Sequence, residues 1–483
     1  MEARALFRAI SVLLSIVALF MLACMLAGIF MGEATATIDI FTIPVAAGAF
    51  LFVLSLIVSS KSVELSQRSG YLFVVLSWIA AALLGAIPFY LAGFSLTPAD
   101  AFFESMSGFT TTGSTILTDI EALPRSLLLW RATTHWLGGM GIVVLTVAVF
   151  PLLGISGRTL MEAEAPGPQV DKFTPRLSHT ASILWLIYLC LTVILTILLM
   201  IGGMSWFDAV THAFATMATG GFSTRNASVG AFDSAFIQIV ITIFMILAGT
   251  GFTIHWRMLT GKKKEALRDH EWRTYIGIFA VSSILIWITL VRLGPDRLWT
   301  ENLRHACFQV ASILTTTGFA TEDYLLWPAF AQTVLFTLMF IGGCAGSTAG
   351  GIKVGRAYTL FKMALSEMKY LLNPHAVYGI FVSGKYMHKK IVYDIAAMVY
   401  LFLGTALLST LVVSSAGYDI LTSLTATLAA QGNIGPGFSL VGPALNYAFF
   451  PGWIKCWLSF IMLVGRLEVY TVLVLLTRAF WKR

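Results

Sequence analysis

The sequence contains few charged residues. Asp, Glu, Lys and Arg make up only 11% of its 483 residues, whereas 58% are hydrophobic. A soluble globular protein of this length needs more polar side chains than that to cover its surface. The composition therefore excludes a water-soluble domain and predicts a protein with several membrane-spanning helices.

The sequence also lacks paired cysteines. Its five cysteines are scattered through apolar stretches without a Cys-x-x-Cys pair, at positions Cys24, Cys190, Cys307, Cys344 and Cys456. This spacing suggests neither a zinc site nor a disulfide framework. We expect small buried thiols, the usual environment of a single cysteine.

Apolar runs of about 20 residues, the length of a membrane-spanning helix, occur ten times. They lie near residues 8–31, 40–60, 70–93, 127–153, 182–203, 235–259, 274–293, 329–360, 392–414 and 447–480. The first run is too long for the core of a signal peptide and lacks an Ala-x-Ala cleavage site, so we expect a retained span.

The basic residues indicate the orientation of these spans. Most of the 31 Lys and Arg residues fall in segments that ten crossings place on one side, among them Lys262-Lys263-Lys264. By the positive-inside rule this side is cytoplasmic, and both termini lie there. We interpret the net charge of +7 as a topology signal and not as a nucleic-acid-binding surface, although a polybasic stretch can also bind a partner or lipid headgroups.

Four short segments rich in Gly and Thr stand roughly a hundred residues apart. These four Gly/Thr turns are Thr110–Gly113, Ala218–Gly221, Thr315–Gly318 and Gly432–Gly435. Each follows a predicted helix of about three turns, which is too short to cross the bilayer, and each such unit lies between two spans. The pattern predicts an all-α membrane protein with four pseudo-symmetric repeats around one pore, after an N-terminal helix pair.

These repeats divide the chain into five expected segments. They are an N-terminal two-helix extension at 1–69 and repeats at 70–155, 156–260, 261–370 and 371–483. The first two half-helices begin with Thr97 to Asp100 and Ser205 to Asp208, which have the spacing of a capping box with Asp in place of Glu.

The chemistry of the four turns favours a monovalent cation. A glycine at the end of a run of small residues lets backbone carbonyls point inward, and four such runs would form a ring of oxygens that replaces an ion's hydration shell. A half-helix that enters from outside places its partly negative C-terminal end near the bilayer centre. The turns contain no basic side chain to attract an anion and no carboxylate to bind a divalent cation.

The sequence resembles the Trk/Ktr/HKT superfamily of potassium transporters, and within it the bacterial TrkH/TrkG membrane subunits. The segments that carry the resemblance are TTTGSTI (110–116), ATGGFST (218–224), TTTGFAT (315–321), GNIGPGF (432–438), GGCAGSTAGGIK (342–353) and GRLEVYT (465–471). The match runs from about residue 70 to the end. It implies potassium uptake across the bacterial inner membrane, no enzymatic activity and no cofactor apart from the transported ion.

The resemblance also implies which residues bind potassium through backbone carbonyls. The matching positions are Thr111, Thr112, Gly113, Thr219, Gly220, Gly221, Thr316, Thr317, Gly318, Asn433, Ile434 and Gly435. Within the family, glycine and not serine at position 113 favours potassium over sodium. The fourth turn lacks the threonine pattern, so a sodium-selective or weakly selective channel of the same fold remains an alternative.

A run of five glycines between Gly342 and Gly351 interrupts one expected span. Each glycine costs about 1 kcal/mol relative to alanine in a helix, so we expect a broken helix. The resemblance implies an intramembrane gate loop at 342–351, with Gly346, Gly350 and Gly351, held across the pore by Arg466. From the residues alone, Arg466 is either this functional group or part of an ion pair with Glu468 or another acid. We expect Lys353 to reach the cytoplasmic water.

Other polar residues allow more than one interpretation. Glu104, His212, Gln309 and Thr425 occupy equivalent half-helix positions, where they either bond to the filter backbone or lie at ordinary contacts between repeats. His135 and His255 have no metal-ligand spacing, and we expect them to be packing residues. An integral-membrane enzyme is a distant alternative, since the sequence shows no clustered acid, base or metal set.

Partners follow from the resemblance alone. It implies a homodimer in the lipid membrane and a cytoplasmic, TrkA-like ring of nucleotide-sensing subunits. We expect that ring to meet the basic loops near 154–180, 261–273 and 370–391, and we expect no nucleic-acid partner.

Overall fold

The computed structural model describes residues 2–57, 66–93, 96–141, 177–373, 375, 379–382 and 385–482. These residues are almost entirely helical. Within the described ranges, strands are limited to the two-residue antiparallel pair β1 (Phe381–Val382) and β2 (Lys385–Tyr386). The predicted all-α fold is confirmed.

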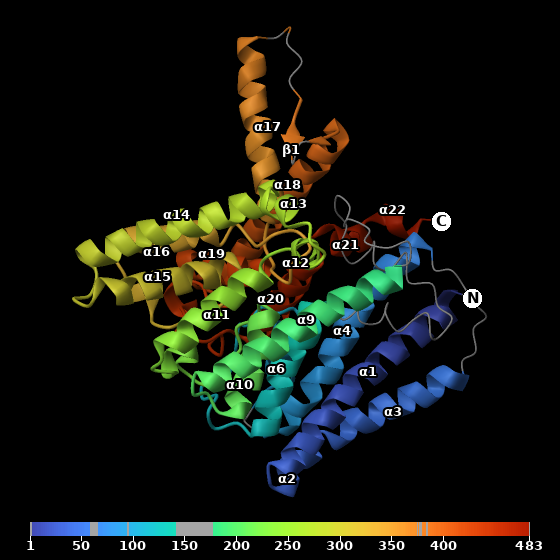
Figure 1. The fold of residues 1–483 in the computed structure, drawn as a ribbon. Coiled ribbons are helices and arrows are strands. Elements are labelled where there is room, and N and C mark those ends of the chain that lie inside the picture. Colours follow the sequence, from blue (N-terminus) through green and yellow to red (C-terminus); the bar gives the residue numbers. More distant parts are fainter. Residues whose placement is uncertain are drawn as a thin grey trace.

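The N-terminal pair is a helical hairpin beside the body of the molecule (Figure 1). It consists of α1 (Glu2–Phe30), the short α2 (Thr35–Asp39) and α3 (Thr42–Ile57). Gly48 of α3 lies so close to α1 that an added Cβ would be 2.1 Å from the Cβ of Ala18. Close contact at small residues is typical of helix pairs in membranes.

Four half-helices form the centre of the fold. They are α5 (Pro98–Phe109), α10 (Trp206–Met217), α15 (Trp299–Leu314) and α19 (Ile420–Gly432). Each is preceded by a long helix, namely α4 (Gln67–Leu91), α9 (Leu177–Ile201), α14 (His270–Leu293) or α18 (Lys389–Ser414). Each is followed by an inner helix, namely α6 (Arg125–Gly139), α11 (Ala235–Ala248), α16 (Ala329–Leu338) or α20 (Gly452–Arg466). The predicted fourfold arrangement is confirmed.

Three of the four half-helices begin at a residue whose side chain caps them, whereas α15 begins after Leu298 without such a cap. Thr97 and Asp100 form the expected capping box, because each side chain accepts a hydrogen bond from the other residue's backbone N–H. The Ser205 hydroxyl accepts from the Asp208 N–H at 3.1 Å. These bonds satisfy N–H groups that a helix cannot satisfy internally.

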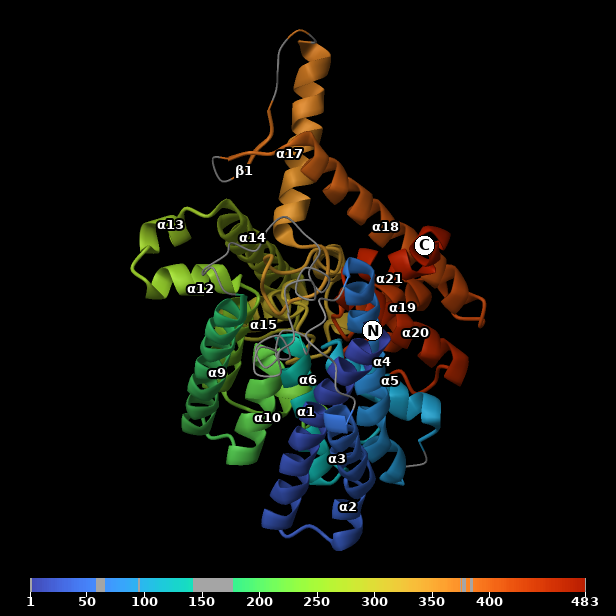
Figure 2. The same cartoon turned by 90° about the vertical axis from the view of Figure 1, so that its right-hand side faces the viewer.

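The membrane spans differ in part from the expectation. Within the described residues, six helices are long and apolar enough to cross a membrane alone, and two bent pairs bring the total to at most eight. The run near 127–153 lies partly outside the described residues. The run near 329–360 divides into α16 and α17 (Val354–Leu372), as its glycines predict, and α17 projects far beyond the helical body (Figures 1 and 2). The count of ten spans stays a prediction.

Two expected spans are bent. The run near 235–259 turns by 97° between α11 and α12 (Phe252–Leu259), and the run near 447–480 turns by 114° between α20 and α21 (Tyr470–Leu473). The second bend has Glu468 and Val469 at φ of 55° and 63°, a conformation that is unfavourable for L-residues. The expected span near 447–480 placed Arg466 in its middle. In the structure Arg466 is instead the last residue of α20.

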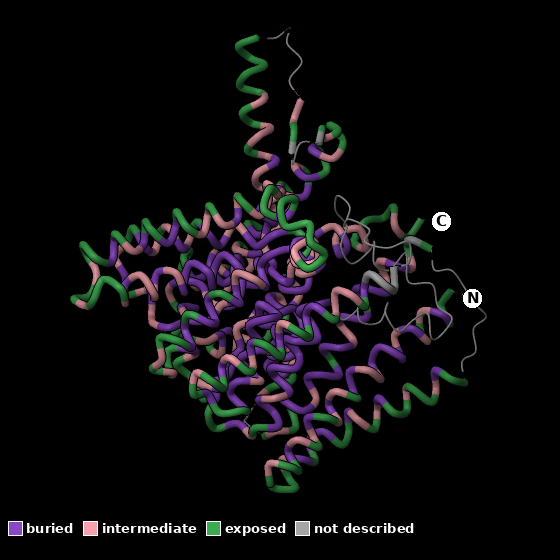
Figure 3. The backbone as a smooth tube through the Cα atoms, viewed as in Figure 1, coloured by how far each residue is buried: buried purple, intermediate pink, exposed green. Residues whose placement is uncertain are grey.

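The two ends of the chain lie on the same side (Figure 1). Arg68 at the start of α4 donates to the carbonyl of Lys482 at 2.7 Å, and the Ser69 hydroxyl donates to Glu2. The remaining elements are α13 (Lys263–Leu267), α22 (Arg478–Trp481), η2 (Ser228–Ala231), η3 (Tyr324–Leu326), η4 (Ser439–Val441) and η5 (Val474–Leu476). Buried residues concentrate in the interior of the body, whereas α17 is mostly exposed (Figure 3).

Candidate ion pathway

The four Gly/Thr turns share one unusual backbone conformation. The residue two positions before each final glycine is left-handed: Thr111, Thr219, Thr316 and Asn433 have φ of 54°, 53°, 58° and 52°. The final glycines Gly113, Gly221, Gly318 and Gly435 have φ of 82°, 81°, 82° and 96°. L-residues seldom adopt this conformation. Its fourfold recurrence shows that the fourth turn is built like the others despite its different sequence.

The four turns close into a ring. A Cβ added to each final glycine would lie against a carbonyl oxygen of the next turn: Gly113 at 2.1 Å from Gly220, Gly221 at 2.0 Å from Thr317, Gly318 at 2.1 Å from Ile434 and Gly435 at 2.8 Å from Thr112. The fourth contact returns to the first turn. Each of these oxygens belongs to the residue before a final glycine, so equivalent carbonyls of all four turns lie next to one another. The structure thus brings the predicted binding residues together.

Side chains inside the turns stabilise this backbone. Thr110 and Thr112 hydroxyls are 2.8 Å apart, and the equivalent Thr315 and Thr317 hydroxyls are 2.7 Å apart. In the fourth turn Asn433 donates from Nδ2 to the Thr112 hydroxyl at 3.0 Å. The asparagine thus ties the fourth turn to the first.

The four equivalent half-helix residues bind the chain that leaves each turn. Glu104 accepts from the Ile116 N–H at 3.0 Å, His212 Nε2 lies 2.9 Å from the Ser223 hydroxyl, Gln309 donates to the Glu322 carbonyl at 3.2 Å, and Thr425 accepts from the Phe438 N–H at 3.0 Å. Of the two interpretations left open by the sequence, the structure supports hydrogen bonding to the filter segment.

Arg131 and His135 on α6 also hold these turns. The Arg131 guanidinium bonds to Glu104 at 2.7 Å and to the Ser223 carbonyl at 2.9 Å, and lies over the Phe222 ring. His135 stacks on the same ring with 4.0 Å between centroids, consistent with a packing role. The sequence reasoning missed Arg131. Its signal was a charged residue inside an apolar run, which calls for a buried partner.

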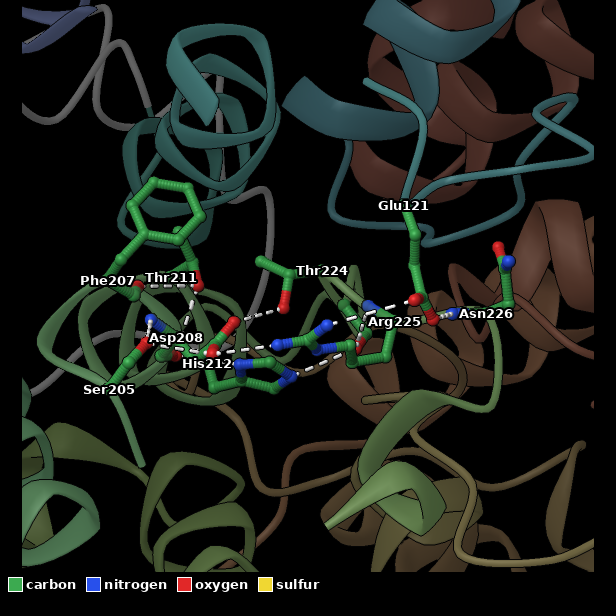
Figure 4. A network of polar contacts seen from close by, with 10 residues as sticks. Glu121, Ser205, Phe207, Asp208, Thr211, His212, Thr224, Arg225 and Asn226 are labelled. Atoms are coloured by element: carbon green, nitrogen blue, oxygen red, sulfur yellow. Dashed lines mark hydrogen bonds and ion pairs between the residues drawn. The ribbon is translucent and has the colours of Figure 1, made fainter. Parts of the chain in front are cut away.

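A polar network surrounds the outer end of the second turn (Figure 4). Asp208 accepts from the Thr224 hydroxyl at 2.6 Å and from Arg225 at 3.3 Å, and Arg225 lies 3.8 Å from Glu121. Asn226 Nδ2 donates to Asp119 at 3.0 Å. The network joins the exit of the second turn to the loop after the first.

The outer segment after the third turn is fixed by an ion pair. Arg297 donates two hydrogen bonds to the Glu322 carboxylate, at 2.7 and 2.8 Å. Burial acts to raise the pKa of Glu322, but the bonds from Arg297 and Trp327 and the nearby charges of Arg297 and His305 together outweigh it and hold the pKa below its ordinary value. Glu322 therefore stays ionised, which keeps this segment in place at neutral pH.

A cavity of about 110 Å³ lies on the outer side of the ring. The four final glycines all line it, together with Ser114 and Tyr447 among others. A second cavity of about 190 Å³ lies on the opposite side and is lined by Gly346, Gly350, Gly351, Lys353 and Arg466 among others. The glycine-rich loop at 342–351, the expected gate loop, lines this inner cavity and contacts the ring through Gly350.

The loop at 342–351 and Arg466 contact the inner ends of three turns and the last residue of the half-helix before the second turn. The Gly350 N–H donates to the Thr316 hydroxyl at 2.7 Å, and the Thr348 hydroxyl donates to the Met217 carbonyl at 3.1 Å. A Cβ on Gly350 would lie 2.3 Å from the carbonyl oxygen of Gly432. Arg466 reaches the first turn through the Thr111 hydroxyl at 3.0 Å.

Arg466 donates to backbone carbonyls. Its guanidinium bonds to the Thr348 carbonyl of the gate loop at 2.8 Å and to the Gly138 and Gly139 carbonyls at 2.5 and 2.9 Å. Glu468 instead pairs with Arg356 at 2.5 Å. Arg466 thus contacts the loop at 342–351, and Glu468 is paired with another arginine; the gating role of Arg466 stays a prediction.

Several other expectations need correction or stay open. Lys353 does not reach cytoplasmic water, because its ammonium is buried and donates to the Ala349 carbonyl of the gate loop. Cys190 and Cys456 are exposed, whereas Cys24 and Cys344 are buried as expected. No group of three or more His, Cys, Asp or Glu residues that could bind a metal occurs within the described ranges.

Comparison with known proteins identifies the family. Residues 41–482 match the family model TrkH, described as a cation transport protein. The "Trk system potassium uptake protein TrkH" of Salmonella typhimurium is 42% identical, and TrkG of Escherichia coli K12 is 35% identical; each match covers 87% of this chain and 87% of the relative. The crystal structure of the potassium transporter TrkH from Vibrio parahaemolyticus matches with a TM-score of 0.88 and 34% identity over 100% of both chains. This chain therefore belongs to the TrkH family of cation transport proteins.

Proposed function

We propose that this chain takes up potassium across the bacterial inner membrane as the pore-forming subunit of a Trk system, with both termini in the cytoplasm. The closed ring of four turns carries the proposal, because it places equivalent carbonyls around one axis. The names of the relatives, Trk system potassium uptake proteins, agree with it. We also propose that the repeats follow the boundaries expected from the sequence. Family membership leaves the membrane-enzyme alternative without support.

The proposed ion site is the backbone of the four turns. Carbonyl oxygens replace the water around a potassium ion, with the ligands at positions 111–113, 219–221, 316–318 and 433–435. The half-helices end at this ring, and their C-terminal partial charges favour a cation there. The threonine hydroxyl pairs and Asn433 keep the carbonyls in position.

The proposed gate is the loop at 342–351 together with Arg466. Its support is that the loop lines the inner cavity and contacts the third turn, the fourth turn and the end of α10, while Arg466 contacts the first turn. Gly346 and Gly351 have φ of 68° and 66°, which a glycine adopts at little cost. Opening requires the loop to leave these contacts.

One observation favours weaker selectivity as a second candidate. The contact of Gly435 with the first turn is looser than the other three, 2.8 Å for an added Cβ against 2.0 to 2.1 Å. A ring with one wide junction holds a dehydrated ion less uniformly. A sodium-selective or weakly selective channel of the same fold is consistent with this asymmetry.

Flux in proteoliposomes tests the function. We expect the purified chain to pass potassium faster than sodium, and its gene to restore growth of a potassium-uptake-deficient bacterium on low potassium. Sodium flux equal to or above potassium flux would favour the second candidate. Absence of any cation flux, in a preparation where Arg466→Ala is also inactive, would contradict both.

We propose that the chain forms a homodimer through α17. This helix projects from the body and exposes apolar side chains at spacings of four, three and four residues, namely Phe361, Leu365, Met368 and Leu372. Their exposed fractions are 63, 41, 61 and 80%. A stripe with this spacing on a projecting helix is typical of a surface that pairs with a second helix.

Introducing charge into this stripe should dissociate the dimer. We expect Leu365→Lys with Met368→Lys to shift the protein from dimer to monomer in detergent, measured by size-exclusion chromatography with light scattering. Glu367→Lys introduces the same side chain on another face of α17 and should leave the dimer intact. A dimer that survives the double substitution would place the interface elsewhere.

We further propose that the cytoplasmic nucleotide-sensing ring binds the basic loops. Lys262, Lys263, Lys264 and Arg268 are all exposed in the segment between α12 and α14, where an acidic partner surface would meet them. Most of the loop near 154–180 and part of the loop near 370–391 lie outside the described residues.

A further inference from the structure

We propose that Glu271 is a positioning residue that holds the gate loop closed from the α14 side. The inference rests on the proposed function, since it assigns to the proposed gate a second side chain that keeps it closed. Glu271 lies in the first turn of α14, outside the sequence motifs that indicated the gate. Its Oε1 atom accepts two hydrogen bonds, from the Ala345 N–H at 2.7 Å and from the Gly355 N–H at 3.0 Å.

These two donors lie on opposite sides of the glycine-rich segment. Ala345 lies in the loop's first half, whereas Gly355 lies in the first turn of α17, just after the loop ends. One carboxylate oxygen therefore connects the first half of the loop to the residues that follow the loop. Gly355 permits this approach, because an added Cβ would lie 2.8 Å from the same oxygen. Hydrogen bonds to an ionised acceptor are stronger than neutral ones.

The two ends of the loop lie side by side and form its neck, residues 342–345 and 352–355, which backbone hydrogen bonds also hold together. The Gly342 N–H donates to the Ile352 carbonyl at 2.7 Å, and the Val354 N–H donates to the Gly343 carbonyl at 3.1 Å. Every residue involved is close to a loop end, so these bonds hold the two ends of the loop together. Glu271 adds two bonds from outside the loop to the same neck.

The segment before Glu271 also touches the loop. The Cys344 N–H donates to the Gly249 carbonyl at 2.9 Å, and the Phe252 N–H donates to the Gly346 carbonyl at 2.9 Å. Thus the break between α11 and α12 binds one flank of the loop, and α14 binds its neck. The exposed lysines of α13 lie between these two attachment points along the chain. A partner that displaces this segment moves Glu271, and the neck loses its two charged bonds.

Arg466 of α20 and Glu271 of α14 thus bind the loop at different points. Arg466 binds the Thr348 carbonyl beside the ring, whereas Glu271 binds the neck on the side of α12 to α14. A carboxylate at a helix N-terminus usually stabilises its own helix. Asp269 already caps α14 by accepting from the Glu271 and Trp272 N–H groups, which leaves the Glu271 side chain available for the loop.

The first test compares basal potassium flux of the full chain in proteoliposomes. We expect Glu271→Ala to raise flux at least about tenfold, the effect of losing a single hydrogen bond to a charged group, without a change in the potassium-to-sodium ratio. Glu271→Gln keeps an acceptor oxygen but not the charge, and its flux should lie between wild type and Glu271→Ala. Glu265→Ala removes an exposed carboxylate of α13 and should behave like wild type.

The second test uses Cys344 as a reporter of the loop. Its side chain is 1% exposed, so an alkylating maleimide should modify it slowly in the wild type. In Glu271→Ala we expect at least about tenfold faster modification, measured by peptide mass spectrometry. Cys24 is 2% exposed in a different part of the fold and should stay protected. Equal acceleration at both cysteines would indicate general loosening and overturn the inference.

The results separate this inference from the proposed function. If Arg466→Ala raises potassium flux but Glu271→Ala leaves it unchanged or lowers it, the gate stands and the role of Glu271 is wrong. If no variant passes potassium, the proposed function fails. In that case Cys344 modification still decides whether Glu271 holds the loop, with unchanged protection counting against it.

Discussion

Replacing Gly221 by alanine is expected to lower potassium flux by more than about tenfold, because it displaces one carbonyl of the ring on which ion coordination depends. The added Cβ would lie 2.0 Å from the Thr317 oxygen. This is much shorter than the contact distance of a carbon and an oxygen atom that are not bonded, so one of the two backbones must shift. Both backbones belong to the proposed ion site. The fold itself should persist, since the change adds a single methyl group.

A matched substitution separates this clash from backbone strain. Gly203 precedes α10 with φ of 98° and has no atom within 4 Å of an added Cβ. Gly203→Ala should therefore cost only the left-handed strain of about 1 kcal/mol and retain normal flux. Flux per folded protein, corrected by thermal unfolding of each variant, is the measurement. Equal losses in Gly203→Ala and Gly221→Ala would argue against a special role of the ring.

The four glycines of the ring differ in how closely they approach the next turn. Gly435 has 0.7 to 0.8 Å more room than the other three, since an added Cβ would lie 2.8 Å from its neighbour against 2.0 to 2.1 Å. The looser junction thus lies where the sequence departs from the threonine pattern. The fourth turn is therefore the part of the ring on which the choice between potassium selectivity and weaker selectivity depends.

The turns and half-helices could be predicted because their signals are local. A capping residue such as Thr97 or Ser205 marks where a half-helix begins, and a left-handed glycine marks where its turn ends. The glycine recurs in all four turns and a capping side chain at three of the four half-helices, and repetition makes weak local signals mutually supporting. The glycine run at 342–351 is equally local, so the broken helix could be foreseen.

The bend after α20 could not be foreseen. Residues 467–469 are Leu, Glu and Val, which include no helix breaker, yet Glu468 and Val469 are left-handed. Contacts distant in sequence offset this strain, among them the Glu468 bond to Arg356. Such a conformation depends on tertiary partners, and partners more than a hundred residues away leave no local pattern.

The support around the ring was likewise hidden. Arg131 belongs to the first repeat but bonds to the Ser223 carbonyl of the second, and Glu271 bonds to a loop about 75 residues later. A single sequence identifies such charges as unusual within apolar segments. It does not tell which distant backbone group each one will reach, because that depends on how the repeats pack.

Replacing Arg466 by alanine is expected to raise basal potassium flux by about tenfold or more while the potassium-to-sodium ratio stays the same. The guanidinium joins the gate loop at the Thr348 carbonyl to the Gly138 and Gly139 carbonyls and to Thr111. Each hydrogen bond from a charged donor contributes about 1.5 to 3 kcal/mol, so its loss favours the open loop. Arg466→Lys keeps the charge with a single donor group and should give an intermediate flux.

The unchanged ion ratio is the part of this result that locates the effect in the gate. Arg466 contacts the first turn at the Thr111 hydroxyl, whereas the proposed ion ligands are backbone carbonyls, so the filter should discriminate as before. Arg292→Ala removes an exposed arginine at the end of α14 and controls for the loss of one positive charge. A lower or unchanged flux in Arg466→Ala would contradict gating. A raised flux with a lost ion preference would mean that the arginine shapes the filter, because opening the loop alone leaves the four turns intact.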